Sequence, residues 1–600
     1  MSRYPIDEQY SFFMEGLMYI IRELLRSVRE YKKLSIITPI LITFEVVIEC
    51  IIPFITATLV NEIKNGCDLG TIIKYGIILT VMAFLSLTFG AVAGSASARA
   101  ACGFAKNLRK DMFYSIQGYS FENIDRFQTS SLITRMTTDV TNVQNAYMML
   151  IRTAIRSPLM LIFAFVMAFV MGGRMAWIFL VVVPILAIGL GIVIYKAFPL
   201  FRKVFAKYDA LNKSIQENIK GMRVVKSFVR EDYEQNKFER AADDVCSDFT
   251  RAERILAFNG PLMQFCMYVV MVFVLSFGSY TIITSRGLDF DIGQFSAILT
   301  YNFMILSSLM MLSMVFVMIT LAAESAKRIV EVIREKSTLA NPENPVYEVN
   351  DGSITFENVS FKYSEKAERM ALSNINLRIR SGETIGIVGG TGSSKTTLVQ
   401  LIPRLYDATE GIVKVGGLDV RNYDLDALRS QVAVVLQKNV LFSGTIKENL
   451  RWGNKFATDE EMTEACRLAC ADEFINRFPD GYDTYVEQGG ANLSGGQKQR
   501  LCIARALLKK PKILILDDST SAVDTRTDAR IREALKEYMP EMTKIIIAQR
   551  IASVKDADRI IVMDRGTING VGTHEQLLSE NEIYREIYYS QNKAGDRNEN

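Results

Sequence analysis

The sequence predicts a helical membrane domain of six spans, followed by a soluble α/β domain. Six apolar runs in the first half are long enough to cross a lipid bilayer. From about Gly352 the pattern changes to short strands alternating with helices. In this second part, Ile513–Asp524 (ILILDDSTSAVD) places four branched apolar residues before two acids, which is typical of a strand buried on both faces. An acid at the end of such a strand lies where α/β folds bind ligands.

The connections between the spans differ in charge. Segment 95–156 holds eight Lys and Arg, segment 196–259 holds thirteen, and each of the other three connections holds one. Because Lys and Arg are retained on the inner side of a membrane, we expect both long segments and both termini in the cytoplasm. The predicted spans lie near residues 36–60, 72–94, 157–173, 175–198, 262–283 and 292–323.

The domain boundaries follow from the same patterns. Residues 1–33 predict an amphipathic helix in the membrane interface, with a packed surface helix as the alternative. Residues 34–335 form the transmembrane domain, whose spans continue as cytoplasmic helices with bends near 121–131 and 221–228. The remaining predicted parts are a linker at 336–351, the soluble domain at 352–590 and a polar tail at 591–600.

Polar residues inside the spans are candidates for a substrate pathway, because they are costly in a membrane. Glu45 and Glu49 lie four residues apart on one helical face, where they suit a cation or an amphipathic cargo. The alternative is that both acids pair with buried Arg or polar partners and serve packing. Asn302 is a weaker candidate of the same kind.

The composition argues against several classes of function. The net charge of +3 gives no reason to expect nucleic-acid binding. The eight Cys form no Cys-X-X-Cys pair and the chain has a single His, so a His/Cys zinc site is not expected. The polar start of the chain shows no cleavable signal peptide.

A phosphate-binding loop follows a second predicted strand, Thr384–Val388. In such loops the backbone amides and glycines surround phosphates, a Lys adds charge and a hydroxyl binds magnesium, which are here Lys395 and Thr396. A helix beginning near Lys395 would add its positive end. Ser394 replaces a Gly of the pattern, which is tolerable where the backbone stays in an ordinary region. The loop residues are Gly389, Gly390, Thr391, Gly392, Ser393, Ser394, Lys395, Thr396 and Thr397.

A second candidate phosphate site is the stretch Leu493–Gln497 (LSGGQ), which precedes a basic amphipathic helix. A Ser hydroxyl and Gly amides at a helix N-terminus can hold a phosphate. One nucleotide needs only one such cradle, and the two lie about a hundred residues apart. This spacing suggests a nucleotide held between two copies of the domain.

Together these motifs resemble an ATP-binding-cassette (ABC) exporter half-transporter of type IV, the multidrug-exporter-like class, from about residue 15 to 588. The resemblance implies a RecA-like P-loop nucleotide-binding domain with a helical subdomain carrying the signature motif, ATP and Mg²⁺ as cofactors, and a place in the membrane of a bacterial cell. It makes Thr396, Gln437 and Asp517 magnesium ligands. It also makes Tyr363 the adenine-stacking residue, Asp524 the D-loop acid, and Ser494, Gly495, Gly496 and Gln497 the signature that holds ATP on the opposite subunit.

Two positions depart from the hydrolytic pattern of this family. Asp517 corresponds to the acid of the family's Walker B motif. The next residue is usually Glu, the base that orients the attacking water, and here it is Asp518. A carboxylate one methylene shorter is displaced by about 1 Å, which can cost ~10²-fold in rate. The switch His of the family is replaced by Gln549, which can hydrogen-bond a phosphate but cannot become cationic.

The intact signature and the altered catalytic positions suggest the degenerate half of a heterodimer. Its own Walker site would bind ATP and hydrolyse it poorly, and a second half-transporter with Glu and His would carry turnover. The expected function is ATP-driven export of an amphipathic or hydrophobic small molecule. The alternatives are a slow homodimer, an importer with this fold for siderophore-like cargo, and a regulatory ATP sensor that does not cycle. A soluble cassette acting on nucleic acid is disfavoured by the six spans.

Overall fold

The computed structural model describes residues 18–364, 367–518 and 523–595, which form two units. A helical unit contains residues up to 117 and residues 128–335. An α/β unit contains residues 118–127 and the chain from 336 onward. The helical unit ends at residue 335, and the predicted transmembrane domain at 34–335 stays a prediction.

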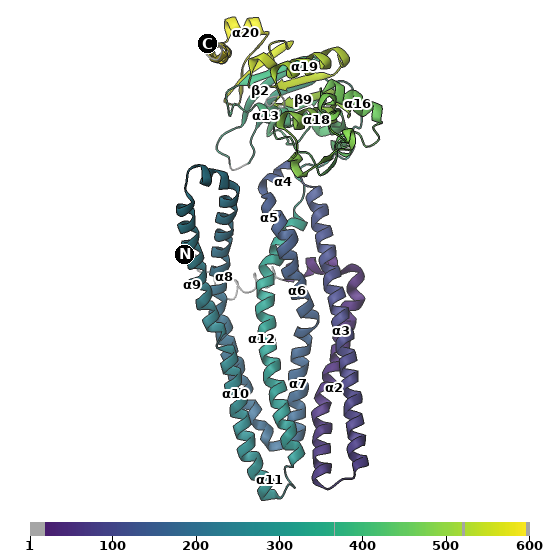
Figure 1. The fold of residues 1–600 in the computed structure, drawn as a ribbon, viewed down its shortest axis with the longest axis vertical. Coiled ribbons are helices and arrows are strands. Elements are labelled where there is room, and N and C mark those ends of the chain that lie inside the picture. The colour runs from purple at the N-terminus through teal and green to yellow at the C-terminus, as the bar shows by residue number, and fades with distance from the viewer. Residues whose placement is uncertain (1–17, 365–366, 519–522, 596–600) are drawn as a thin grey trace. The chain divides into compact units, whose positions relative to one another are not determined.

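The helical unit consists of long helices joined by short turns (Figure 1). Residues 18–25 are helical and lead into its first short helix. Its elements are η1 (Arg26–Tyr31), α2 (Lys32–Lys64), α3 (Leu69–Gln117), α5 (Thr129–Thr134), η2 (Arg135–Asp139), α6 (Val140–Ile151), α7 (Thr153–Gly172), η3 (Gly173–Ala176), α8 (Trp177–Ser227), α9 (Glu231–Leu256), α10 (Asn259–Phe273), η4 (Val274–Gly278), α11 (Ser279–Ser285) and α12 (Ile292–Arg334).

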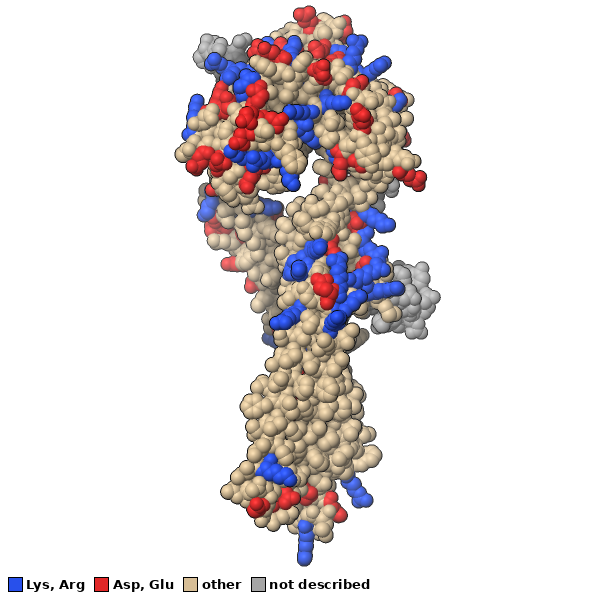
Figure 2. Space-filling model, turned by 90° about the vertical axis from the view of Figure 1, so that its right-hand side faces the viewer, with Lys and Arg blue, Asp and Glu red and all other residues tan. Residues whose placement is uncertain are grey.

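Among the described residues, five helical segments are long and apolar enough to cross a membrane. The third of them, 129–201, contains both predicted spans at 157–173 and 175–198, so the count of six spans stays a prediction. On the face drawn in Figure 2, this unit shows a broad belt of uncharged residues, with Lys and Arg gathered along one border. Such a belt is the surface that a lipid bilayer requires. The segments are Met18–Lys64, Leu69–Gln117, Thr129–Phe201, Glu231–Ser285 and Ile292–Arg334.

The predicted interfacial helix over residues 1–33 is described only from residue 18, since 1–17 lie outside the described residues. The helix does not run through to Lys33 as one piece. Arg29 adopts a φ of +42° inside η1, and α2 begins three residues later. Asn107 of α3 donates a hydrogen bond to the Ser27 carbonyl at 3.0 Å, so the N-terminal segment packs against α3 at this break.

The two predicted bends have different outcomes. The first is confirmed, because α3 ends at Gln117 and the short helix α4 (Phe121–Arg126) separates it from α5. The second lies later than predicted: α8 continues through Gly221 and turns only at residues 228–230. A glycine lowers helix stability without ending a helix by itself, so Gly221 was a weak signal.

The α/β unit is built on one mainly parallel sheet and one antiparallel sheet. Its strands are β1 (Ile354–Phe361), β2 (Leu372–Ile379), β3 (Thr384–Gly389), β4 (Glu410–Val415), β5 (Leu418–Asp419), β6 (Val432–Val435), β7 (Gly444–Thr445), β8 (Tyr485–Val486), β9 (Ile513–Asp517), β10 (Thr543–Ile547), β11 (Arg559–Asp564) and β12 (Thr567–Gly572). Its helices are α4, α13 (Lys395–Gln400), η5 (Val420–Asn422), α14 (Leu425–Gln431), α15 (Ile446–Leu450), α16 (Asp459–Leu468), α17 (Asp472–Ile475), η6 (Gly481–Asp483), η7 (Gln488–Gly490), α18 (Gly495–Leu507), α19 (Thr525–Tyr538), η8 (Ile551–Ser553), α20 (His574–Glu580) and α21 (Glu582–Gly595).

The six-stranded sheet has the order β12-β11-β3-β10-β9-β6, and the five strands from β11 to β6 are parallel. The antiparallel sheet has the order β2-β1-β4-β5. Side chains of β9 alternate between two hydrophobic cores: Leu514 and Leu516 enter one, and Ile513 and Ile515 enter the other. Ile513–Asp517 is therefore a strand buried on both faces, as predicted.

The segment 118–127 packs on the α/β unit to which it belongs. Tyr406 donates a hydrogen bond to Asp125 Oδ2 of α4 at 2.6 Å, and the Phe121 ring lies edge-on to the Tyr406 ring. Asn123 of α4 donates to the Lys336 carbonyl at 3.1 Å, which ties α4 to the predicted linker. The predicted polar tail at 591–600 begins within α21, and residues 596–600 lie outside the described residues.

Candidate functional site

Four neighbouring strands deliver the predicted site residues to one edge of the sheet. The phosphate loop follows β3, Gln549 follows β10, Asp517 ends β9, and Gln437 follows β6. In the sheet these strands are adjacent, in the order β3-β10-β9-β6. Because parallel strands place their carboxyl ends at a common edge, residues far apart in the sequence line one cavity of about 540 Å³. Its lining residues are Gly389, Gly390, Thr391, Gly392, Ser393, Ser394, Lys395, Thr396, Thr397, Gln437, Asp517, Asp518, Ile547, Gln549 and Ile587.

The phosphate loop has the backbone that its sequence predicts, with one exception. A Cβ at Gly389 would lie 2.2 Å from the Met563 carbonyl oxygen, so only Gly fits there. The Lys395 ammonium donates to the carbonyls of Gly389 and Gly390 at 2.9 Å each, and α13 begins at this Lys as expected. Burial lowers the pKa of Lys395, while Asp517 and Asp518 act in the opposite direction.

Ser394 is the exception, because it does not stay in an ordinary backbone region. It adopts φ +69° and ψ +27°, the left-handed conformation that favours Gly. A non-Gly residue costs roughly 1–2 kcal/mol there.

Ser394→Gly should therefore stabilise the folded chain by about 1 kcal/mol, after the larger entropy loss of Gly on folding is subtracted. The midpoint of thermal unfolding of the purified chain should rise by roughly 2 °C. Ser393→Gly is the matched control, since φ at this neighbour is not left-handed and the change should lower the midpoint. Equal losses for both variants would contradict the strain at residue 394.

Asp517 and Thr396 meet at the centre of the cavity. The Thr396 hydroxyl lies 3.0 Å from both carboxylate oxygens of Asp517, which is buried. Burial raises the pKa of Asp517 and the neighbouring Asp518 adds to this, while the hydrogen bond from Thr396 opposes it. A hydroxyl and a carboxylate are the hard oxygen ligands that Mg²⁺ uses beside phosphates, so these residues fit a magnesium–nucleotide complex.

Asp518 is held by two amide side chains. Gln549 donates to its Oδ2 at 2.8 Å, and Gln437 donates to the same oxygen at 3.4 Å. Asp518 has φ +48°, a left-handed conformation that Asp enters more readily than most residues. Burial raises the pKa of Asp518, and the hydrogen bonds from Gln437 and Gln549 oppose that rise.

Tyr363 lies beside the phosphate loop. Its hydroxyl is 2.9 Å from the Thr397 hydroxyl, and it donates to Gln400 Oε1 at 3.3 Å. Its ring stands edge-on to the Tyr406 ring, with the ring centroids 5.3 Å apart. Tyr406 therefore contacts both Tyr363, the predicted adenine-stacking residue, and Asp125 of α4. No sequence motif predicted that Tyr406 connects these two residues.

The signature residues do not join the cavity among the described residues. Ser494 caps α18: its hydroxyl accepts from the Gln497 amide at 3.3 Å, and Gln497 Oε1 accepts from the Ser494 amide at 2.8 Å. Gly495 and Gly496 begin the helix. Asp524 caps α19, and the bond from the Thr527 backbone lowers its pKa.

The membrane acids Glu45 and Glu49 of α2 pair with Arg156 of α7. Arg156 Nη1 donates to Glu45 Oε1, and Arg156 Nη2 contacts both Glu49 oxygens at 2.8 and 2.9 Å. A Cβ at Gly90 of α3 would lie 3.0 Å from Glu45 Oε1, so α3 packs closely against the Glu45 carboxylate. Asn302 of α12 is buried and donates to the Met267 carbonyl at 3.2 Å.

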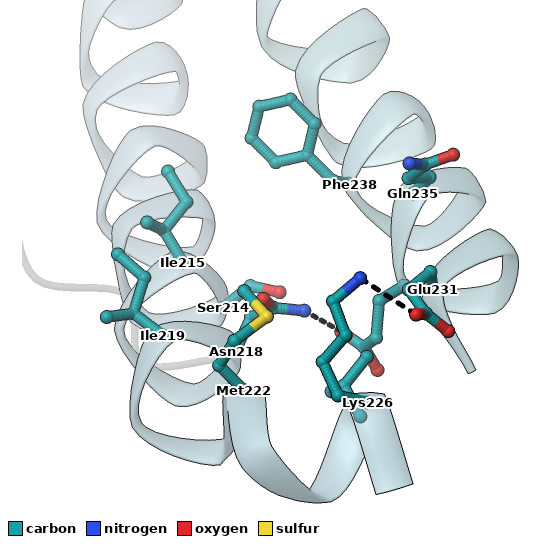
Figure 3. A pocket seen from close by; sticks show the side chains of 11 residues that line it. Ser214, Ile215, Asn218, Ile219, Met222, Lys226, Glu231, Gln235 and Phe238 are labelled. Carbon is teal, nitrogen blue, oxygen red and sulfur yellow. Dashed lines mark hydrogen bonds and ion pairs between the residues drawn. The ribbon is translucent and has the colours of Figure 1, made fainter. Parts of the chain in front are cut away.

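An open groove of about 540 Å³ runs between α8 and α9 near the turn that joins them (Figure 3). Ile215, Ile219 and Met222 of α8 lie across from Phe238 of α9. Lys226 and Glu231 form an ion pair of 2.9 Å at the turn. These residues lie within or beside the bend that the sequence predicts near 221–228.

Comparisons with known proteins agree with these two units. Residues 35–321 match the ABC transporter transmembrane region, and residues 372–521 match the ABC transporter domain. An uncharacterised ABC transporter ATP-binding protein of Bacillus subtilis, YfiB, is 36% identical over 571 residues, which is 95% of this chain and 98% of that protein. The ATP-dependent lipid A-core flippase of Desulfotalea psychrophila is 34% identical, over 81% of this chain and 84% of that protein.

The fold is also similar to that of a solved bacterial Atm1-family ABC exporter with ATP bound. The TM-score is 0.80 at 24% identity, over 94% of this chain and 98% of the other. The two family models match this chain in the order transmembrane region and then ATP-binding domain, and the similarity to YfiB extends over both. This chain therefore belongs to the ABC transporter family, as a multi-pass membrane protein whose ATP-hydrolysing domain drives transport.

Proposed function

We propose that this chain is one half of a heterodimeric exporter of amphipathic or hydrophobic compounds, and that its own Walker site holds ATP without efficient hydrolysis. The observation that carries the proposal is the hydrogen bonding of Asp518, whose Oδ2 accepts from both Gln549 and Gln437. A general base must reach the attacking water at hydrogen-bond distance. Asp518 is one methylene short for that task, and two amides already engage its outer oxygen.

Gln549 supports the same proposal independently. Its amide is neutral at every physiological pH, so it can donate one hydrogen bond to a phosphate oxygen but adds no positive charge. Charge at this position stabilises the transition state of phosphoryl transfer. A site with Lys395, Thr396 and Asp517 in place, but without Glu and His, is suited to binding ATP more than to cleaving it.

The signature residues support a second chain. The capping box of Ser494 and Gln497 presents a pre-formed helix N-terminus at the start of α18, outside the cavity that Lys395 lines. A partner half-transporter that carries Glu and His would use this signature at its own ATP site. The side chains of Phe228 and Val229 at the α8–α9 turn are exposed, which supports a docking role for that turn on the partner.

The cargo class rests on the membrane unit and on one relative. The flippase of Desulfotalea psychrophila is named for a lipid A core, an amphipathic molecule. A lipid-like amphipathic substrate is therefore the class that this similarity supports for the chain.

The experiment is purification of the tagged chain from its native membrane together with the partner that it retains. Reconstituted in vesicles, the pair should hydrolyse ATP and move the amphipathic dye Hoechst 33342. Replacing the catalytic Glu of the partner by Gln should abolish turnover, whereas Asp518→Asn should change it by less than about twofold. Brisk ATPase activity by this chain alone, abolished by Asp518→Asn, would reject the heterodimer.

A further inference from the structure

The last helix of the α/β unit, α21, borders the nucleotide site. It lies outside residues 372–521, which match the ABC transporter domain. Tyr584 at its start is fully buried, with its hydroxyl 2.7 Å from His574 Nδ1. The Tyr584 amide donates to Asn581 Oδ1 at 2.9 Å, which caps the helix. The first turn of α21 is thus fixed to α20 and to the core.

One face of α21 points toward the end of β10. Tyr584, Ile587, Tyr588 and Gln591 recur at the i, i+3, i+4, i+7 spacing that forms a single helix face. Ile587 is among the residues that line the phosphate cavity. Gln591 lies two turns beyond the buried Tyr584, so the anchored helix sets its position.

The Gln591 side chain forms hydrogen bonds with the backbone on both sides of Arg550. Its Nε2 donates to the Gln549 carbonyl at 2.7 Å, and its Oε1 accepts from the Ile551 amide at 2.9 Å. A side-chain amide that makes both bonds acts as an extra peptide group beside this segment. The Gln549 side chain then donates to Asp518 Oδ2 at 2.8 Å.

We propose that Gln591 is a positioning residue for the nucleotide site. By fixing the backbone of residues 549–551, it limits Gln549 to motion of its side chain between Asp518 and the terminal phosphate of bound ATP. Holding a donor in place before the ligand arrives removes part of the ordering cost of binding. This inference rests on the proposed function in one respect, that the site holds ATP.

Loss of Gln591 should weaken the binding of a nucleoside triphosphate but not that of a diphosphate. ADP lacks the phosphate that a donor at residue 549 would reach, so only ATP affinity should depend on Gln591. The test uses the purified full-length chain in nanodiscs, with Mg²⁺–AMPPNP or Mg²⁺–ADP displacing a fluorescent ATP analogue. Gln591→Met keeps the length of the side chain and removes both hydrogen bonds. It should weaken AMPPNP binding about fivefold and leave ADP binding unchanged.

Three further variants separate positioning from general packing. Gln591→Glu keeps the acceptor for the Ile551 amide, loses the donor to Gln549, and should show the same selective loss. Ser590→Ala on the same helix is the matched control and should bind both nucleotides like the wild type. In a Gln549→Ala background, Gln591→Met should have no further effect, because the residue through which it acts is gone.

Equal weakening of AMPPNP and ADP, no change for either, or a loss that persists in Gln549→Ala would overturn the assignment of Gln591. Failure of the wild-type chain to bind AMPPNP would instead reject the proposed function of the site. The two failures are therefore distinguishable in one set of titrations.

Discussion

Asp518→Glu combined with Gln549→His should raise the ATPase rate of the purified chain about 100-fold. The longer carboxylate brings a base to the attacking water, and about 1 Å of position is worth ~10²-fold. The change Gln549→His also frees the carboxylate from one amide donor and introduces an imidazole that can carry positive charge. Phosphate release at saturating Mg²⁺–ATP measures the gain in the full-length chain, whose own LSGGQ signature would complete each site in a dimer of two copies.

Controls assign the gain to this site. Lys395→Ala added to the double variant should return the rate to that of the starting chain, because the loop then lacks its phosphate-binding charge. Asp518→Asn in the wild type should change the slow rate little. Glu enters a left-handed backbone less readily than Asp, so Asp518→Glu should cost a little stability at φ +48°. A double variant that folds, binds ATP and gains nothing would contradict the assignment of these two positions.

The nucleotide site could be predicted to a large extent because its residues follow strands. The sequence predicts Thr384–Val388 and Ile513–Asp517 as strands, and parallel strands bring their ends to one edge. The phosphate loop and both acids needed only this topology to meet. The signature residues 494–497 were also recognisable as a motif. Among the described residues, however, none of them lines the nucleotide cavity of the same chain.

The contacts that could not be predicted from the sequence join residues that belong to no recognisable sequence motif. Tyr406 and Asp125 are 281 positions apart, and neither belongs to a motif. Gln591 acts through two backbone groups, the carbonyl of residue 549 and the amide of residue 551, which any residue except a proline at 551 could supply. The left-handed backbone of Ser394 could not be predicted from the sequence, because a Ser residue usually has a negative φ.

In the membrane unit, the sequence identified Glu45 and Glu49 but not their partner. Arg156 lies at the start of α7, where a count of charges assigns it to a cytoplasmic segment. Only the packing of α2 against α7 brings its guanidinium to both acids. The geometry matches the alternative in which the acids pair with a buried Arg, while a pathway role stays a prediction.

Arg156→Met should destabilise the helical unit by about 3–5 kcal/mol, the cost of leaving partly buried acids without their cation. The yield of monodisperse protein in detergent and the midpoint of thermal unfolding measure this loss. Arg152→Met is the matched control one turn away, since the described residues give Arg152 no ion pair with either acid, and it should have a smaller effect.

Neutralising Glu45 and Glu49 distinguishes a structural role, in which they hold α2 to α7 through Arg156, from a role in a substrate pathway. Glu45→Gln and Glu49→Gln, added to Arg156→Met, remove every charge of the trio and should restore most of the lost stability, because a buried ion pair replaced as a whole costs little. Absence of that rescue would mean that Arg156 stabilises the unit through packing of its stem and not through the acids. In the rescued variant, transport of a cationic dye that falls while ATPase activity persists would assign Glu45 and Glu49 to the pathway. Transport that matches the wild type would leave the trio a structural clamp between α2 and α7.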